Sequence, residues 1–329
     1  MARFNIQKKE TKEVSWKEAL IERINEGKAL PIISYVVGNN LVFGNTDELI
    51  DGWAYYTDYP TEDRNLAHMS QYLNVMAQAK GHDSEQIKRD YLIFLKEALQ
   101  SIADEDLVEE LNEDMNASKL TFSETADRLQ FPNFETGLDN PLLILAKLPL
   151  PIYLTTSYHT FLEMALQREH KQPRTEICYW NNQLGRIQSV FSLQSDYHPS
   201  VEEPLVYHIH GLDAHPASLV LTEDDHLDFL VNTARDWEGV PLIVRKALTD
   251  SALMLLGFGL NSWDFRTVFR GFIKTSLAER RPKSVAIQLQ GDQTQQNYLL
   301  NYLDLEGKFE VYWGDTRNFM REIWQAWAS

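Results

Sequence analysis

The sequence predicts an α/β fold with a mostly parallel sheet and helices on both of its faces. Short apolar runs such as "IYLTTS" (152–157) and "ALMLLGFG" (252–259) lack the polar alternation that a half-exposed strand shows. Longer stretches between such runs place apolar residues three and four positions apart, which is typical of amphipathic helices. Strands that are buried on both faces and separated by helices are the pattern of a Rossmann-like fold.

The elements follow in order along the chain. Residues 16–27 predict a helix, and the apolar run "KALPIISYVVGNNLVFG" (28–44) predicts a buried strand that ends in turn residues. Between residues 48 and 130 the spacing is helical, so we expect a helical insertion, a small subdomain within one domain that covers residues 1–329. Strands and helices then alternate, with further strands predicted at 152–157, 175–180, 204–211, 252–259, 283–290 and 309–314.

The composition limits the classes of partner. The formal net charge is −17, from 31 Lys and Arg against 48 Asp and Glu, so we expect no direct binding to nucleic acid or to an anionic membrane. The single cysteine, Cys178, excludes an internal disulfide and a multi-cysteine zinc module within this chain. The charged first residues lack the apolar core of a signal peptide, and no run is long enough to span a bilayer. These observations predict a cytoplasmic protein.

Small and polar residues gather where the predicted strands end, which is where open α/β sheets bind ligands. These loops are "SYVVGNN" (34–40), "TTSYHT" (155–160), "HIHG" (208–211) and "GFGLNSWD" (257–264). In the last loop Asn261 and Ser262 can cap a helix that starts at Trp263, which leaves N–H groups free for an anion. Asp264 is favoured in the first turn of that helix by the dipole. A plain strand-to-helix turn explains the loop equally well.

Read together, "TTSYHTFLE" (155–163), "YHIHG" (207–211) and "LLGFGLNSWDFR" (255–266) resemble the sirtuin-like NAD-consuming family, in particular its bacterial branch of antiphage-defence effectors. In that branch one strand ends in Thr-Thr-Asn-Tyr-Asp, a later strand ends in His-Gly, and a third ends in Gly-Phe-Ser or a near variant with an aspartate soon after. The resemblance implies that the protein hydrolyses NAD to nicotinamide and ADP-ribose without a metal. It also implies antiviral defence by abortive infection, in a homo-oligomer or with a partner defence protein.

The resemblance also assigns roles to residues. His210 matches the catalytic histidine and would act as a general base, although a histidine that only caps the strand end is the alternative. Ser157 and His159 stand where the family has its asparagine and aspartate, and the resemblance implies that both belong to the catalytic site. Ser157 would position the water or the ribose, with His159 beside it. The residues expected to contact NAD are Gly38, Asn39, Thr155, Thr156, Gly257, Gly259, Asn261 and Asp264.

Two departures from the family keep a second function open. The family's glycine-rich loop is missing after the first strand, where only Gly38 and the asparagines that follow it can form a tight turn near a phosphate. Ser157 and His159 also differ from the family residues in their hydrogen-bonding groups. A catalytically impaired sirtuin-like module that senses NAD or another nucleotide is therefore the alternative.

Three other chemistries fit the sequence less well. His208, His210, Asp213 and His215 could ligate zinc, but two insertions break the His-x-His-x-Asp-His spacing of metallo-β-lactamases. Deacylation is less favoured because the sirtuins that modify proteins carry a four-cysteine module. A serine hydrolase is disfavoured because the chain has no Gly-x-Ser-x-Gly motif.

Overall fold

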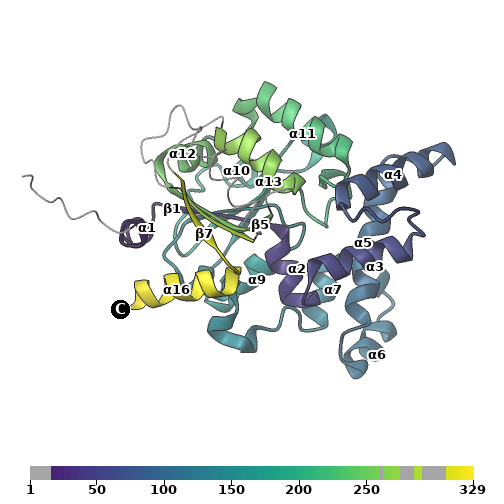
Figure 1. Ribbon diagram of the computed structural model, residues 1–329, viewed down its shortest axis with the longest axis horizontal. Helices are drawn as coiled ribbons and strands as arrows, with labels where there is room; N and C mark the ends of the chain where they lie inside the picture. The colour runs from purple at the N-terminus through teal and green to yellow at the C-terminus, as the bar shows by residue number, and fades with distance from the viewer. Residues whose placement is uncertain (1–15, 260–261, 275–284, 291–308) are drawn as a thin grey trace, which may run out of the picture.

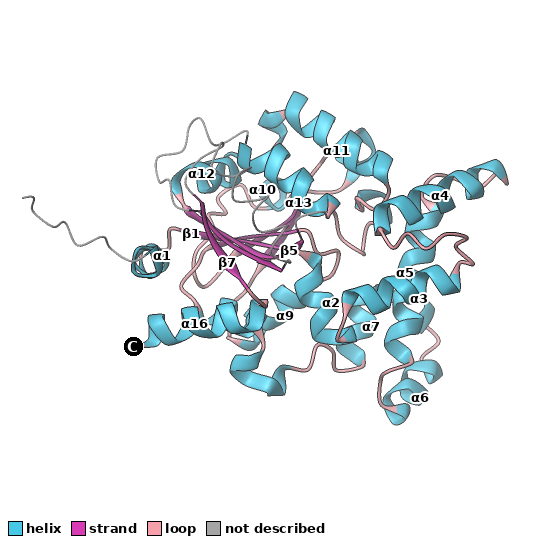
Figure 2. Cartoon of the chain, viewed as in Figure 1, coloured by secondary structure: helices cyan, strands magenta, loops and turns pink. Residues whose placement is uncertain are grey.

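The structure is a computed structural model that describes residues 16–259, 262–274, 285–290 and 309–329 (Figure 1). Over these residues seven strands form one all-parallel sheet in the order β3-β4-β2-β1-β5-β6-β7. The strands are β1 (Ala29–Ile33), β2 (Ile152–Thr155), β3 (Arg174–Ile177), β4 (Leu205–His208), β5 (Ala252–Gly259), β6 (Val285–Gln290) and β7 (Phe309–Trp313). Helices lie on both faces of this sheet, so the predicted Rossmann-like α/β class is confirmed (Figure 2).

The helices divide into three groups (Figure 1). One face of the sheet carries α10 (Val190–Leu193), α11 (Glu223–Arg235), α12 (Leu242–Asp250) and α13 (Trp263–Val268), which a π-helical turn (Phe269–Lys274) extends. The other face carries α2 (Tyr35–Phe43), α8 (Pro141–Lys147), α9 (Phe161–Arg168) and α16 (Thr316–Ala328), with α1 (Trp16–Asn25) beside the sheet. Between β1 and β2 the chain forms α3 (Thr46–Tyr56), α4 (Leu66–Ala79), α5 (Gln86–Gln100), α6 (Glu105–Glu113) and α7 (Phe122–Arg128).

Two apolar cores lie on the two faces of the sheet. Successive residues of a strand point to opposite faces, so Ile32 belongs to the core under α11 to α13, whereas Ile33 belongs to the core on the side of α2 and α16. Trp53 of α3 and Tyr91 of α5 belong to the same core as Ile33. The apolar core of the helical segment between β1 and β2 is therefore continuous with the core on that face of the sheet. None of the described helices is both long and apolar enough to cross a membrane.

The first strand is shorter than the sequence predicts. It ends at Ile33, and residues 35–43 form α2 where we expected more strand and a turn, so that part of the prediction is wrong. The Ser34 hydroxyl accepts the N–H of Val36 and caps the new helix. Because α2 is largely buried and mostly apolar, its sequence lacks the polar face by which a surface helix is recognised.

Candidate functional site

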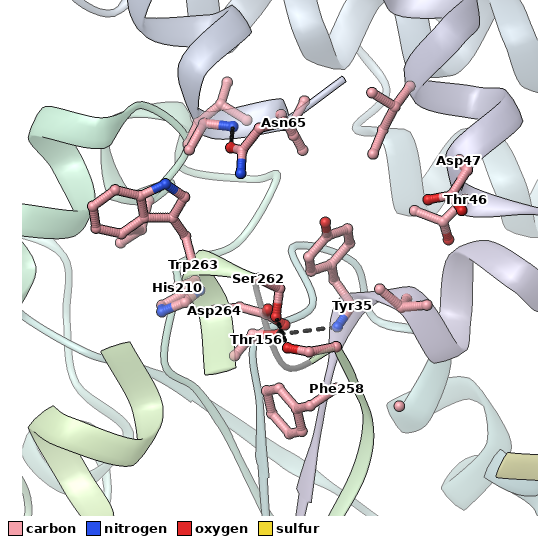
Figure 3. Close-up of a pocket in the computed structure, with 18 of the residues that line it drawn as sticks. Tyr35, Thr46, Asp47, Asn65, Thr156, His210, Phe258, Ser262, Trp263 and Asp264 are labelled. Atoms are coloured by element: carbon pink, nitrogen blue, oxygen red, sulfur yellow. Dashed lines mark hydrogen bonds between the residues drawn. The ribbon is translucent and has the colours of Figure 1, made fainter. Parts of the chain in front are cut away.

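A cavity of about 490 Å³ lies at the carboxyl ends of β1, β2 and β5, next to the first turns of α3 and α4 (Figure 3). The chain order reverses at β1, which has β2 on one side and β5 on the other, and open α/β sheets bind ligands at such a point. The volume suits a small molecule or a cofactor. Its wall includes Tyr35, Asn40, Thr46, Asp47, Asn65, Thr156, His210, His226, Phe258, Ser262, Trp263 and Asp264.

Four helices begin at the wall of this cavity. The first two residues of α2, α3, α4 and α13 all line it, namely Tyr35, Val36, Thr46, Asp47, Leu66, Ala67, Trp263 and Asp264. The helix dipole gives each helix start a partial positive charge, which favours an anionic ligand. Side-chain oxygens of Ser34, Asn45 and Asn65 already accept N–H groups in the first turns of α2, α3 and α4. Arg64 adds a guanidinium to the wall, although its Nε bonds the Asp51 carboxylate at 2.6 Å. Asp63 beside it opposes this positive potential.

Asp264 ties together the ends of three strands. Its carboxylate accepts the Ser34 hydroxyl at 2.7 Å and the Thr156 hydroxyl at 3.4 Å. The Thr156 oxygen in turn accepts the N–H of Tyr35 at 3.0 Å (Figure 3). Burial raises the pKa of Asp264, and the hydrogen bonds counteract part of that rise. The predicted helix start is confirmed, since Ser262 caps α13 and Asp264 lies in its first turn. Asp264 therefore holds the cavity floor in shape as well as lining it.

His210 lines the cavity two residues beyond the end of β4. Its side chain is buried, and Nε2 lies 3.1 Å from the Thr267 hydroxyl of α13. The ring meets His226 and Phe229 of α11 edge-on, with 5.2 Å between ring centroids in both pairs. Burial, aided by His226, holds the pKa of His210 well below its ordinary value, so the imidazole is neutral at neutral pH. A neutral imidazole in a cavity wall can accept a proton from a ligand.

His226 and Trp263 are wall residues that the sequence reasoning did not select. The two rings stack with centroids 5.5 Å apart, and His226 Nδ1 is buried without a hydrogen-bond partner among the described residues. Burial lowers the pKa of His226 to about 3. The sequence pattern predicts a helix around His226 but does not show which element the helix faces, so no local signal places His226 beside the strand ends.

Ser157 and His208 form a buried hydrogen-bonded group behind the cavity. His208 Nδ1 lies 2.7 Å from the Ser157 carbonyl oxygen, and Nε2 lies 2.8 Å from the Glu163 carboxylate. Burial disfavours charge on His208, yet the Glu163 carboxylate, the Ser157 carbonyl group and Asp213 together outweigh it and raise the pKa of the ring. Ser157 itself is not among the described wall residues of the cavity. The structure thus brings Ser157 to His208 rather than to the cavity wall.

Gly38, Asn39 and His159 pack against one another rather than forming a phosphate loop. Gly38 lies inside α2, so it does not form the tight turn that the sequence left open. A Cβ atom on Gly38 would lie 2.2 Å from His159 Cε1, and the His159 ring stacks on Phe161 with 3.8 Å between centroids. Asn39 is buried and accepts the Tyr158 hydroxyl at 3.0 Å. Gly38 is glycine because a neighbouring imidazole fills the space of a side chain.

Of the other residues predicted to contact NAD, some line the cavity and others do not. Gly257 and Gly259 line the cavity, and Gly257 has a positive φ of 77° that favours glycine. Thr156 lines it as well, whereas the Thr155 hydroxyl bonds the Ile33 carbonyl oxygen at 3.1 Å inside the sheet. Asn261 lies outside the described residues.

The helical segment is bonded to the first turn of α11, next to the cavity. Three side chains of α4 and α5 each contact one of three successive acidic residues. The pairs are His68 with Glu223 at 2.9 Å, Gln71 with Asp224 at 2.7 Å, and Lys88 with Asp225 at 2.8 Å. Only the Lys88–Asp225 pair is largely buried, with side-chain exposures of 6% and 14%. These bonds hold α4 and α5 against the first turn of α11.

The histidine-rich loop does not assemble a metal site in the part of the chain that the structure describes. His208 bonds Glu163, and His210 bonds Thr267 on a different helix. No group of three or more His, Cys, Asp or Glu side chains that could hold a metal ion occurs among the described residues. The geometry of this loop therefore supplies no reason to assign it metal chemistry.

Comparison with known families finds a match over the segment that contains β2 to β6. Residues 151–306 match the family model of the SIR2-like domain. The match supports a sirtuin-like domain and is consistent with a protein that uses NAD. It includes Thr156, His210 and Asp264 of the cavity wall, and it leaves the helical segment between β1 and β2 outside the matched range. A comparison with curated proteins finds no match.

Proposed function

We propose that the protein binds NAD in the cavity at the ends of β1, β2 and β5 and hydrolyses it to nicotinamide and ADP-ribose. The observation that carries the proposal is His210, a buried and neutral imidazole in the wall of this cavity and within the SIR2-like segment. The helix starts around the cavity favour the diphosphate of a dinucleotide. The ring faces of Tyr35 and Trp263 offer apolar surface for its bases.

The proposed reaction needs one proton acceptor. The bond between ribose C1′ and the nicotinamide nitrogen breaks, and its electron pair neutralises the positive charge of the nicotinamide ring. The oxygen of a water molecule then bonds to C1′, and the proton that it loses goes to His210, directly or through a ribose hydroxyl. His210 suits this role because burial keeps it unprotonated at neutral pH.

Nucleotide binding without turnover is the second candidate function. Binding without turnover is favoured by the positions of Ser157 and His159. These residues stand where the sirtuin-like family that the chain resembles has its asparagine and aspartate. Neither residue is among the described wall residues, and His159 is packed between Gly38 and Phe161. A protein of this kind would sense NAD or a related nucleotide, or act as an assembly module.

Nicotinamide release by the purified protein separates the two candidates. We expect release by the wild type and a loss of about 10²- to 10⁴-fold in His210→Ala, the range that a general base contributes. His215→Ala is the matched control, because His215 belongs to the same loop, is not a described wall residue and should leave the rate unchanged. Full activity in His210→Ala would reject the assignment. Saturable NAD binding without release would favour the sensor.

The physiological role rests on the resemblance alone. We infer an antiphage effector in the cytoplasm that depletes NAD on infection and works as a homo-oligomer or with a partner defence protein. Bacteria that express the wild type should lose NAD and resist phage after infection, whereas bacteria that express His210→Ala should do neither. Equal NAD levels and equal plaque counts in the two strains would contradict this role. Light scattering on the purified chain reports its oligomeric state.

A further inference from the structure

The Thr267 hydroxyl lies among three hydrogen-bond partners. It is 2.9 Å from the Trp263 carbonyl oxygen, 3.1 Å from the Asp264 carbonyl oxygen and 3.1 Å from His210 Nε2. Carbonyl oxygens only accept hydrogen bonds, and a hydroxyl has one proton to donate. A threonine hydroxyl inside a helix commonly donates its proton to a carbonyl group one turn before it, here the carbonyl groups of Trp263 and Asp264. On that pattern the Thr267 oxygen accepts from His210, and Nε2 carries the hydrogen.

This arrangement determines the state of the other ring nitrogen. A neutral imidazole has one hydrogen, so a hydrogen on Nε2 leaves Nδ1 with a free lone pair. Among the described residues none forms a hydrogen bond with Nδ1, and His210 lines the cavity. Two ionisable groups lie nearby: His226 of α11 faces the ring, and the Asp264 carboxylate of α13 is bonded by Ser34 and Thr156. Neither of them bonds Nδ1.

We propose that Thr267 is a positioning residue that holds His210 with its hydrogen on Nε2 and so makes Nδ1 the atom that accepts a proton in the cavity. Thr267 is completely buried in α13, which begins at the Ser262 cap beside the cavity. The helix therefore determines which nitrogen of a histidine on another element is basic. The catalytic meaning of this proposal rests on the proposed NAD hydrolysis, but the position of the hydrogen does not.

The position of the hydrogen can be measured without any ligand. Protein labelled with ¹⁵N-histidine is studied by long-range ¹H–¹⁵N correlation NMR near pH 7.5, and the His210 signals are those that His210→Gln lacks. We expect the Nε2–H form in the wild type. Thr267→Val keeps the shape of the side chain but removes the hydroxyl, so it should shift His210 toward the Nδ1–H form, while Thr267→Ser should keep the Nε2–H form. A wild type in the Nδ1–H form, or a Thr267→Val variant that still holds only Nε2–H, overturns the proposal.

The rate of nicotinamide release then tests the catalytic meaning. Thr267→Val should lower kcat by about 10- to 100-fold, a part of the 10²- to 10⁴-fold that a general base contributes, with KM for NAD little changed. Thr267→Ser should restore most of the rate, which a purely structural defect would not predict. If the wild type releases no nicotinamide, the proposed hydrolysis fails, whereas the NMR result still decides the role of Thr267. If the wild type does release nicotinamide, a Thr267→Val variant with the wild-type kcat contradicts the positioning role.

Discussion

The contact between Gly38 and His159 makes a sharp prediction about stability. In Gly38→Ala the new methyl carbon would lie 2.2 Å from His159 Cε1 and 2.4 Å from His159 Nε2. His159 has little freedom to move away, because it is 2% exposed and stacks on Phe161 at 3.8 Å. We therefore expect alanine, which is the best helix former, to destabilise this helix position.

The magnitude follows from two opposing contributions. Alanine in place of glycine inside a helix stabilises by about 1 kcal/mol, and overpacking a well-filled core costs about 1–3 kcal/mol. The contact lies far below van der Waals distance, so the upper part of that range applies, and the free energy of unfolding should fall by about 1–2 kcal/mol. Gly52→Ala in α3 is the matched control, because its new methyl group would meet Phe94 at 3.4 Å. That variant should be unchanged or slightly more stable.

Urea unfolding of four proteins tests this reasoning. The wild type, Gly38→Ala, His159→Ala and the double variant form a cycle, and removal of the His159 ring should make Gly38→Ala harmless or stabilising. The expected coupling is about 2 kcal/mol, as for residues in direct contact. Gly38→Ala with wild-type stability, or an effect that persists in the His159→Ala background, would refute the assignment of Gly38 as a packing position.

The remaining predictions concern the stability of the fold at acidic pH and the ion pair between the helical segment and α11. Burial lowers the pKa of His159 and of His226 to about 3 and that of His210 well below 6.5. Unfolded chains bind these protons below about pH 6.5 and the folded protein does not, so stability should fall as the pH falls from about 6.5 toward 3, by up to about 1.4 kcal/mol per pH unit for each histidine. Lys88→Met should cost about 3 kcal/mol in urea unfolding, because it leaves the Asp225 carboxylate without its buried partner.

Each of these predictions has its own control. For the acid effect, His159→Phe should reduce the pH slope of stability by up to about 1.4 kcal/mol per pH unit. An unchanged slope would show that His159 binds its proton in the folded protein. For the buried pair, Arg168→Met is the comparison, since Arg168 and Glu135 form an ion pair with side-chain exposures of 51% and 81%. Its loss should cost no more than about 1 kcal/mol, and a Lys88→Met variant of similar stability would contradict the role given to Lys88.

Local sequence patterns predicted much of the sheet and one key residue of the cavity. The run at 252–259 is strand β5, because a strand that is apolar on both faces has few alternatives in an α/β chain. Ser262 caps α13 as expected, since the cap bond connects residues three positions apart. His210 reaches the cavity because the carboxyl ends of parallel strands meet at one edge of the sheet.

The same reasoning failed at α2, where the deciding contacts are distant. Val36, Val37 and Val42 suit a strand locally, but Ser34 caps a helix there and donates its hydroxyl to Asp264, which is 230 positions away along the chain. Propensity is a weak preference that such tertiary contacts override. Because these contacts make residues 35–43 a helix, Gly38 does not form the turn near a phosphate that the sequence left open.

The sequence by itself determined the α/β class, the order of the elements from β2 onward and the presence of a histidine at the end of β4, because these depend on periodicity and on short-range caps. Only the tertiary structure decided which polar groups face the cavity. It directs His226 and Trp263 into the wall, buries His159 against Gly38 and places Thr267 against His210. The physical reason is that the direction of a side chain is determined by its packing partners, and those partners come from elements far apart in the chain.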